Sequence, residues 1–121
     1  MVFMAGCLSA FIGVAFGAFA AHALKTRLPA DLFAIFEVGV RYQMYHAFAL
    51  FVVSWAMSRW ESGWFVSSAG MFAACTVLFS GSLYLLSLTG LRWLGAVTPV
   101  GGLLFLTGWL SLAVGVWKSH G

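Results

Sequence analysis

Charged side chains are scarce in this sequence. Only 7% of its 121 residues are Asp, Glu, Lys or Arg, whereas 63% are hydrophobic. A soluble domain carries roughly 25% charged residues, so this chain lacks the polar surface that would coat a globule in water. Its six basic residues are scattered and give a net charge of +3 without a basic patch. This pattern excludes nucleic acid as a partner and favours membrane lipid, whose anionic headgroups account for the sign of the charge.

Cysteine and proline are also rare, with two residues of each. Cys7 and Cys75 lie inside apolar runs, without CxxC spacing or a nearby histidine. A disulfide framework is therefore excluded, and both thiols are interpreted as small hydrophobic side chains. No metal site and no cofactor are predicted. Pro29 and Pro99 stand where each suits the first turn of a helix, so they leave the long apolar runs uninterrupted.

Those apolar runs are long enough to cross a bilayer as helices. They predict an all-α membrane protein, a single domain over residues 1–121 with four transmembrane helices packed as a bundle. The predicted spans are about 2–24, 41–58, 65–88 and 99–117, and an amphipathic segment at about 29–40 precedes the second span. The first run lacks the positive flank of a secretory signal and is longer than its apolar core. The chain is thus expected to be a multi-pass protein of the cell inner (plasma) membrane.

Small residues recur along one face of the first span at spacings of three and four. They are Gly6, Ala10, Gly13 and Gly17. Small residues let two helix backbones approach closely in a membrane. This face is predicted to pack on another helix, and the first helix is a candidate contact for a homo-oligomer or for a membrane-protein partner.

Basic residues also bear on the orientation in the membrane. With four spans, both termini lie on one side. The first and third loops would then carry most of the basic residues, namely Lys25, Arg27, Arg41 and Arg92, against Arg59 and Lys118 on the other side. Positive residues favour the cytoplasm, so these two loops are expected to be cytoplasmic and the termini outside.

Polar side chains crowd into residues 36–48, directly before the second apolar run. Helical spacing of four brings Glu37 to Arg41, Arg41 to Tyr45, and Tyr42 to His46. His22 closes the first span and His46 opens the second, so the two imidazoles are expected at one depth. With the basic side chains at the same membrane face, the predicted polar cluster is His22, Lys25, Glu37, Arg41, Tyr42, Tyr45, His46 and Arg92.

Four interpretations of this cluster are open. A structural network is favoured, because polar groups in a membrane need partners and Glu37 can pair with Arg41. A lipid-headgroup site would use Arg41, Lys25 and Arg92. A proton or ion path would use His22, Glu37 and His46, and the same two histidines could ligate a haem.

Three long motifs resemble one family. They are GAFAAHALK at 17–25, FEVGVRYQMYHA at 36–47, and FSGSLYLL at 79–86 followed by GLRWLG at 90–95 and TPVGG at 98–102. The chain is similar over nearly its whole length to the YgdD-like family of small bacterial inner-membrane proteins, a domain of unknown function with a relative in animals. This resemblance implies a four-helix protein of the plasma membrane and no established reaction. Ala21 stands where the family usually carries a glycine before the histidine.

No serine or cysteine lies in a recognisable nucleophile motif, so the chain is not expected to be an enzyme. The leading hypothesis is a structural or interaction protein of the cell envelope. The alternative is a small transporter or channel-like oligomer. A lipid-headgroup or haem-binding membrane protein is the third hypothesis.

Overall fold

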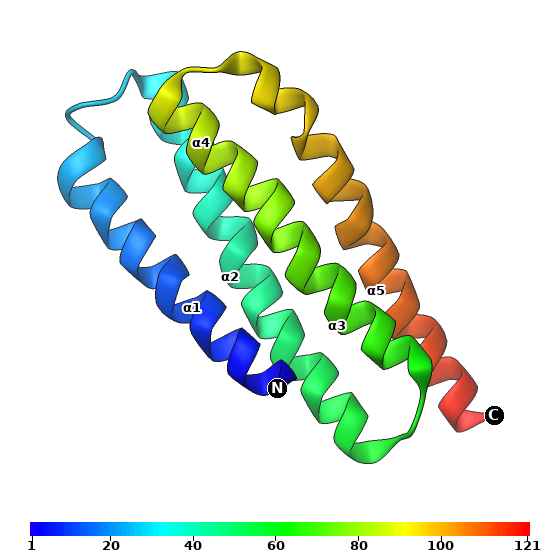
Figure 1. Cartoon of the computed structure of the whole chain (residues 1–121). Helices are drawn as coiled ribbons and strands as arrows, with labels where there is room; N and C mark the ends of the chain where they lie inside the picture. Colours follow the sequence, from blue (N-terminus) through cyan, green and yellow to red (C-terminus); the bar gives the residue numbers. More distant parts are fainter.

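The computed structural model describes all 121 residues and is helical almost throughout. Some segments are π-helical or 3₁₀ turns that continue a neighbouring α-helix, so the chain forms four rods (Figure 1). The first rod is α1 (Val2–Phe19) with η1 (Ala20–Leu24), and the second is α2 (Ala30–Arg59). The third is α3 (Gly63–Cys75), η2 (Thr76–Ser80) and α4 (Gly81–Thr89), and the fourth is η3 (Arg92–Ala96) with α5 (Thr98–His120).

Successive rods run in opposite directions because short turns connect them. Both termini therefore lie at the same end of the bundle (Figure 1). Local sequence sets the turns. The Ser62 hydroxyl accepts a hydrogen bond from the backbone N–H of Trp64 and caps α3, and Gly90 ends α4 with a φ of 73°. Glycine suits that left-handed conformation because it has no Cβ.

The amphipathic segment predicted at 29–40 and the span predicted at 41–58 form one continuous helix, α2. By length and composition, three rods can cross a membrane, namely Val2–Leu24, Gly63–Thr89 and Arg92–His120. The helix α2 is not among them. It differs by carrying charged side chains along its length, Asp31, Glu37, Arg41 and Arg59, in addition to the polar Gln43 and His46.

The first rod packs mainly against α2. Its glycines make the contact close. A Cβ atom built on Gly13 would lie 2.6 Å from the sulfur of Met44, and one on Gly6 would lie 2.8 Å from the ring of Phe51. Gly17 faces Val40 at 3.3 Å. The small-residue face of the first helix therefore lies against a helix of the same chain.

The fourth rod packs mainly against α3 and η2, and again glycine sets the distance. Three glycines of α5 recur every seven residues, and three phenylalanines of the third rod recur at the same spacing. The facing pairs are Gly101 with Phe79, Gly108 with Phe72, and Gly115 with Phe65. A Cβ atom on any of the three glycines would lie within 2.8 Å of its phenylalanine.

The third rod contains a π-helical turn at η2, between α3 and α4. A π-turn holds more residues than an α-turn, so it rotates the faces of the helix on either side of it. Before this turn in the chain, α3 packs mainly on α5, and after it α4 packs mainly on α2. The third rod thereby contacts both the second and the fourth rod with its apolar and small residues.

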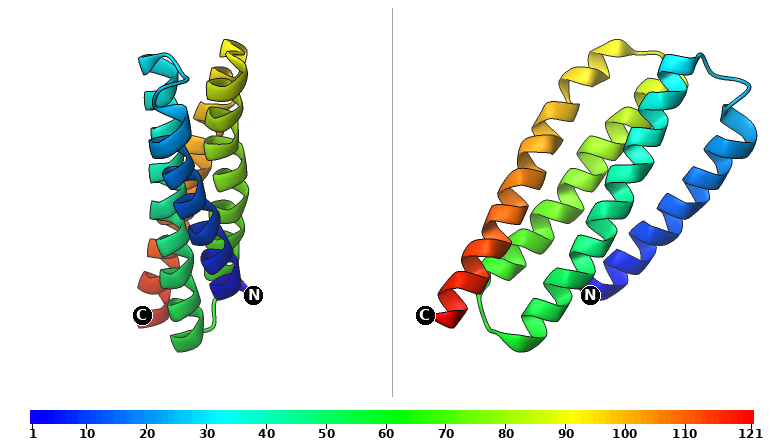
Figure 2. Two further views of the ribbon diagram at one scale, coloured as in Figure 1. Left: turned by 90° about the vertical axis from the view of Figure 1, so that its left-hand side faces the viewer. Right: turned by 180° about the vertical axis from the view of Figure 1, so that it is seen from behind.

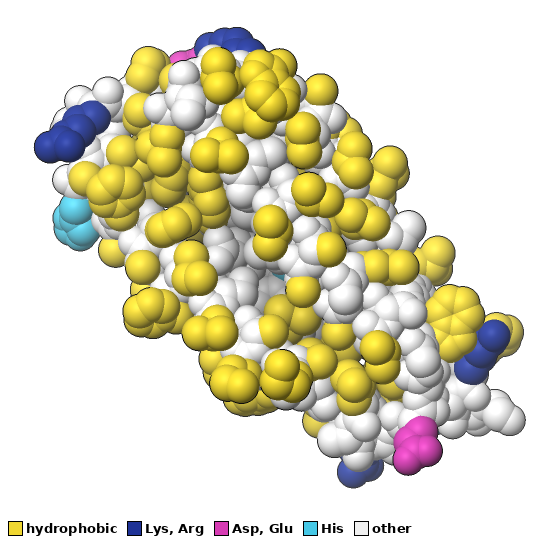
Figure 3. Space-filling model, viewed as in Figure 1, with side chains coloured by type: hydrophobic (Ala, Val, Ile, Leu, Met, Phe, Trp, Pro, Cys, Tyr) yellow, Lys and Arg dark blue, Asp and Glu magenta, His cyan; other side chains and the backbone are white.

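Charged side chains gather at the two ends of the rods, and the visible sides of the bundle carry apolar and uncharged groups (Figure 3). Many large apolar side chains on these sides are exposed, including Phe11, Val14 and Trp117. A soluble protein rarely exposes so much contiguous apolar surface, whereas a protein surrounded by lipid does.

Candidate functional site

His46 lies in the middle of the bundle and is 4% exposed. Its Nδ1 is 2.8 Å from the backbone carbonyl of Tyr42, and its Nε2 is 3.1 Å from the indole nitrogen of Trp109. Its ring stacks on Phe105, with centroids 3.5 Å apart and an angle of 9° between the planes. The imidazole of α2 thus joins α2 to α5.

These two hydrogen bonds define the protonation state of His46. A carbonyl only accepts and an indole N–H only donates, so Nδ1 carries the proton and Nε2 accepts. The imidazole is therefore neutral, and neither nitrogen has a free lone pair for a metal. His22, by contrast, is exposed in η1. The bundle does not bring the two histidines together as bis-histidine haem ligation requires, since His46 faces α5 and His22 lies on the first rod.

Gln43 is the second buried polar side chain of α2, 5% exposed. Its Nε2 donates to the backbone carbonyl of Ser9 in α1 at 2.9 Å. Its Oε1 accepts from the Tyr84 hydroxyl of α4 at 2.6 Å. One amide therefore links three rods.

Serine hydroxyls join the rods in the same way. Each donates to a backbone carbonyl on another rod: Ser68 to Gly108 at 2.9 Å, Ser80 to Gly39 at 2.7 Å, and Ser111 to Trp64 at 2.9 Å. Two of the three bonds lie at or beside the glycine–phenylalanine contacts of α5. Buried polar groups thus stabilise the helix contacts where the backbones come closest.

The predicted pairing of Glu37 with Arg41 is not present. The protein has one ion pair, between Arg92 and Asp31, with 2.9 Å between Nη2 and Oδ2. Glu37 and Arg41 are both exposed on α2 and form no hydrogen bond or ion pair. Helical spacing brings two side chains within reach, but exposed charges at this position can remain solvated by water or headgroups, so spacing alone does not make a pair.

The other predicted residues lie at the surface. Tyr42 and Tyr45 are 38% and 53% exposed, and their rings meet edge to face. Glu37, Arg41 and Tyr45 line a shallow pocket of about 300 Å³ between α1 and α2. Lys25 is exposed at the end of η1. Of the predicted polar cluster, only His46 is buried.

The Asp31–Arg92 pair ties the start of α2 to η3 at one end of the bundle. Both side chains are more than half exposed. The hydrogen bond from the Arg92 guanidinium lowers the pKa of Asp31 below its ordinary value. Water screens such a pair, so its effect on stability is small.

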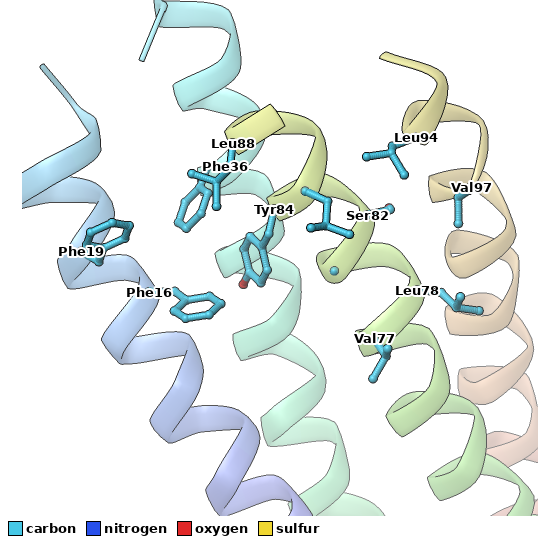
Figure 4. Close-up of a pocket in the computed structure, with 12 residues that line it drawn as sticks. Phe16, Phe19, Phe36, Val77, Leu78, Ser82, Tyr84, Leu88, Leu94 and Val97 are labelled. Atoms are coloured by element: carbon cyan, nitrogen blue, oxygen red, sulfur yellow. The ribbon is translucent and has the colours of Figure 1, made fainter. Parts of the chain in front are cut away.

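A lateral cleft runs between the first rod and the η2–α4 part of the third rod. It comprises two adjoining cavities, an upper one of about 520 Å³ and a lower one of about 380 Å³, which share Val77, Gly81 and Tyr84 as walls. Figure 4 shows the upper cavity, with Phe16 projecting from α1 toward Tyr84. Viewed with α1 toward the reader, the first rod crosses in front of the space between α2 and the third rod (Figure 2).

The lower cavity of the lateral cleft has polar groups in an otherwise apolar wall. Ser9, Gln43, Thr76 and Tyr84 contribute to it. The Ser9 hydroxyl is the one buried side-chain polar atom of the protein without a hydrogen-bond partner. No residue with a charged side chain lines either cavity.

Comparison with known proteins places this bundle in a family. Residues 16–102 match the family described as "Protein of unknown function (DUF423)". The chain belongs to this family. As a DUF423 protein, it is 43% identical over 115 residues to UPF0382 membrane protein YwdK of Bacillus subtilis, with 93% of each chain covered. It is 46% identical over 108 residues to UPF0382 inner membrane protein YgdD of Escherichia coli K12, with 89% of this chain and 82% of that one covered.

No solved structure matches the chain. The family resemblance given by the sequence motifs is confirmed, and so is the localisation: the chain is a helical protein of the inner membrane whose family has no assigned function. The DUF423 match covers both the polar residues of α2 and the glycine Gly101 of α5.

Sequence reasoning missed three of the residues that organise the interior, namely Gln43, Tyr84 and Trp109. Gln43 stood inside the polar stretch at 36–48, and an amide so close to an apolar run is a usable signal. Tyr84 and Trp109 gave no comparable signal, because aromatic residues are common in membrane helices.

Proposed function

We propose that this protein is a four-span, non-enzymatic protein of the plasma membrane with a structural or interaction role in the cell envelope. The observation that carries this proposal is how its interior polar groups are used. Gln43, His46, Ser68, Ser80 and Ser111 each hydrogen-bond to another rod. Groups engaged in this way stabilise a fixed bundle, which is what a structural role requires.

The length of α2 supports a fourth span. From Arg41 to Arg59 the helix takes 18 steps, which rise roughly 27 Å at 1.5 Å per residue and approach the thickness of a hydrocarbon core of about 30 Å. Between these two arginines, the buried Gln43 and His46 have partners inside the bundle. The 11 residues from Ala30 to Val40 would then extend beyond the hydrocarbon, where Asp31 and Glu37 can meet water.

The distribution of basic residues supports an orientation with both termini outside. Lys25, Arg27 and Arg92 lie at the end of the bundle where the first and third turns are, and Arg59 and Lys118 lie at the opposite end. By the positive-inside rule the first end is cytoplasmic. Fusions of a reporter to the C-terminus test this, and strong cytoplasmic reporter activity there would reverse the orientation.

The competing function is a transporter or channel-like oligomer, and ion flux distinguishes the two. The purified protein is reconstituted into vesicles loaded with a pH-sensitive dye, and a proton gradient is applied. We expect the rate of dye response to equal that of protein-free vesicles. Glu37→Gln serves as the informative variant, because Glu37 is exposed and unpaired and its replacement leaves the fold intact. A proton flux that the wild-type protein supports and Glu37→Gln removes would overturn the proposal.

A further inference from the structure

Two opposite charges on α2 have no partner within the chain. Glu37 and Arg41 are both exposed, and the one ion pair of the protein joins Asp31 to Arg92 instead. Both residues line the shallow pocket of about 300 Å³ between α1 and α2. A charge at a membrane is costly unless it meets water or a group of opposite charge, so this pocket suits a ligand that carries both signs.

The depth of this pocket in the membrane follows from the neighbouring rod. Gly17 of α1 also lines it, seven residues before the apolar span Val2–Leu24 ends. Seven residues rise about 10 Å, so the pocket lies close to the end of that span. The Cα–Cβ bonds of α2 tilt toward its N-terminus, at the same end of the bundle, so long side chains here can extend toward the membrane surface. Phospholipid heads meet the hydrocarbon at this level.

Three polar side chains of the pocket follow the order of groups in a phospholipid head. Glu37 is nearest the end of the bundle, Arg41 lies one turn further in, and Tyr45 lies one turn beyond that, with about 6 Å between successive positions. A phosphatidylethanolamine molecule in the adjoining leaflet has its ammonium outermost, then its phosphate, then the ester carbonyls of its glycerol. A carboxylate, a guanidinium and a phenol hydroxyl are complementary to these three groups in turn.

We propose that the pocket between α1 and α2 binds the head of phosphatidylethanolamine. Glu37 accepts hydrogen bonds from the ammonium, Arg41 donates to the phosphate, and Tyr45 donates to an ester carbonyl. The acyl chains lie along the same two helices, where a second shallow pocket of about 590 Å³ is lined by hydrophobic residues alone, Val14 and Phe51 among them. This binding site goes beyond the structural role proposed above and does not depend on it.

Glu37 is the group that selects among lipid heads. Arg41 alone would favour an anionic lipid such as phosphatidylglycerol. The Glu37 carboxylate repels a head that has no cation and attracts an ammonium. Phosphatidylcholine carries a cation, but its quaternary nitrogen has no N–H group to donate, so it forms no hydrogen bond with Glu37. The pocket is therefore expected to prefer phosphatidylethanolamine to both.

Two substitutions separate these contributions. Arg41→Gln removes the charged contact with the phosphate, so it should weaken binding of phosphatidylethanolamine at least tenfold. Glu37→Gln removes the contact with the ammonium, so it should weaken this binding about fivefold and abolish the preference over phosphatidylglycerol. Arg59→Gln and Glu61→Gln are the matched controls, because both residues are exposed at the opposite end of the bundle.

The probe is radiolabelled dioleoyl phosphatidylethanolamine, bound at equilibrium to the purified full chain in detergent micelles. Unlabelled phosphatidylethanolamine, phosphatidylglycerol and phosphatidylcholine with the same acyl chains compete for the site, so differences among them report on the head alone. We expect saturable binding by the wild type and both controls, with phosphatidylethanolamine the strongest competitor. Glycerophosphoethanolamine, which is the head without its chains, should compete weakly because it lacks the apolar contacts.

Four results would overturn the proposal. They are the absence of saturable binding by the wild type, unchanged affinity in Arg41→Gln or Glu37→Gln, equal competition by the three lipids, and competition by glycerophosphoethanolamine as strong as that of the whole lipid. Equal competition would assign the surface to acyl chains alone. Both residues are exposed and unpaired, so melting temperatures of the variants should equal that of the wild type. If one variant does not fold, the other carries the test.

Discussion

The two outer rods of the bundle both use glycine to pack, yet they are held very differently. In the fourth rod, α5 meets three phenylalanines at regular spacing. The Gly108 carbonyl of α5 accepts a hydrogen bond from Ser68, and the Ser111 hydroxyl of α5 donates one to the carbonyl of Trp64. The first rod packs mainly on α2, with one side-chain hydrogen bond, from Gln43 to Ser9. Within their most apolar windows, 33% of the fourth rod is buried but only 11% of the first.

This difference shows what an incomplete set of helix contacts creates. A rod that packs mainly on one neighbour leaves much of its other face to lipid and leaves space beside it. The lateral cleft lies where α1 would otherwise meet the third rod. Rigid packing at α5 and open packing at α1 therefore coexist in one small bundle, and substitutions at equivalent glycines should separate them.

The largest loss of stability is expected from a substitution at Gly101. A Cβ atom there would lie 2.7 Å from the backbone nitrogen of Phe79, and backbone cannot move aside as a side chain can. Gly101→Ala should lower the free energy of unfolding by about 2–3 kcal/mol. Gly102→Ala is the control, since its Cβ meets only ring atoms of Phe79, at 3.8 Å. Thermal unfolding in detergent measures both, and equal melting temperatures would mean that the contact at Gly101 adapts.

A smaller effect is expected at Gly13 in the first rod. Its Cβ would meet the sulfur of Met44, the far end of a flexible side chain that can change rotamer. Gly13→Ala should lower the free energy of unfolding by about 1 kcal/mol or less. The same unfolding measurement applies. A loss as large as that of Gly101→Ala would show that α1 is held as rigidly as α5.

The smallest effect is expected at the exposed end of the bundle, where Arg92 lowers the pKa of Asp31. A carboxylate with a lowered folded-state pKa stabilises the fold at pH above its unfolded value, and the contribution is lost as pH falls through the folded-state pKa. Asp31→Asn should therefore lower the melting temperature slightly at pH 7. The difference from wild type should vanish in acid, and a difference that persists there would contradict the ion-pair explanation.

Sequence patterns predicted the parts of this fold that depend on one helix at a time. The apolar runs located the rods, and the glycine spacing of the first span indicated a close-packing face. Contacts between helices were harder to predict, because the pattern of one helix does not indicate which other helix it packs against. Glu37 and Arg41 were expected to pair and do not, whereas Asp31 and Arg92 pair across 61 positions. The seven-residue spacing of Gly101, Gly108 and Gly115 was visible, but its match to Phe79, Phe72 and Phe65 emerges only when α5 lies antiparallel to the third rod.

The candidate site was predictable only in outline for the same reason. Residues 36–48 did contain two interior polar groups, His46 and Gln43, and the charged members of that stretch proved to be exposed. Burial depends on which face of α2 meets another rod. That face is set by Tyr84 and Trp109, which lie far away in the sequence.

The π-helical turn at η2 has a consequence for how this sequence can change. A residue added to or removed from a helix turns everything beyond it by about 100°. Deleting one residue between Thr76 and Ser80 would tighten the turn and swing α4 so that Ser82 and Tyr84 face new neighbours, although every side chain remained. Insertions and deletions in these five positions should therefore be tolerated less well than many substitutions, because the number of residues there aligns the two halves of the rod.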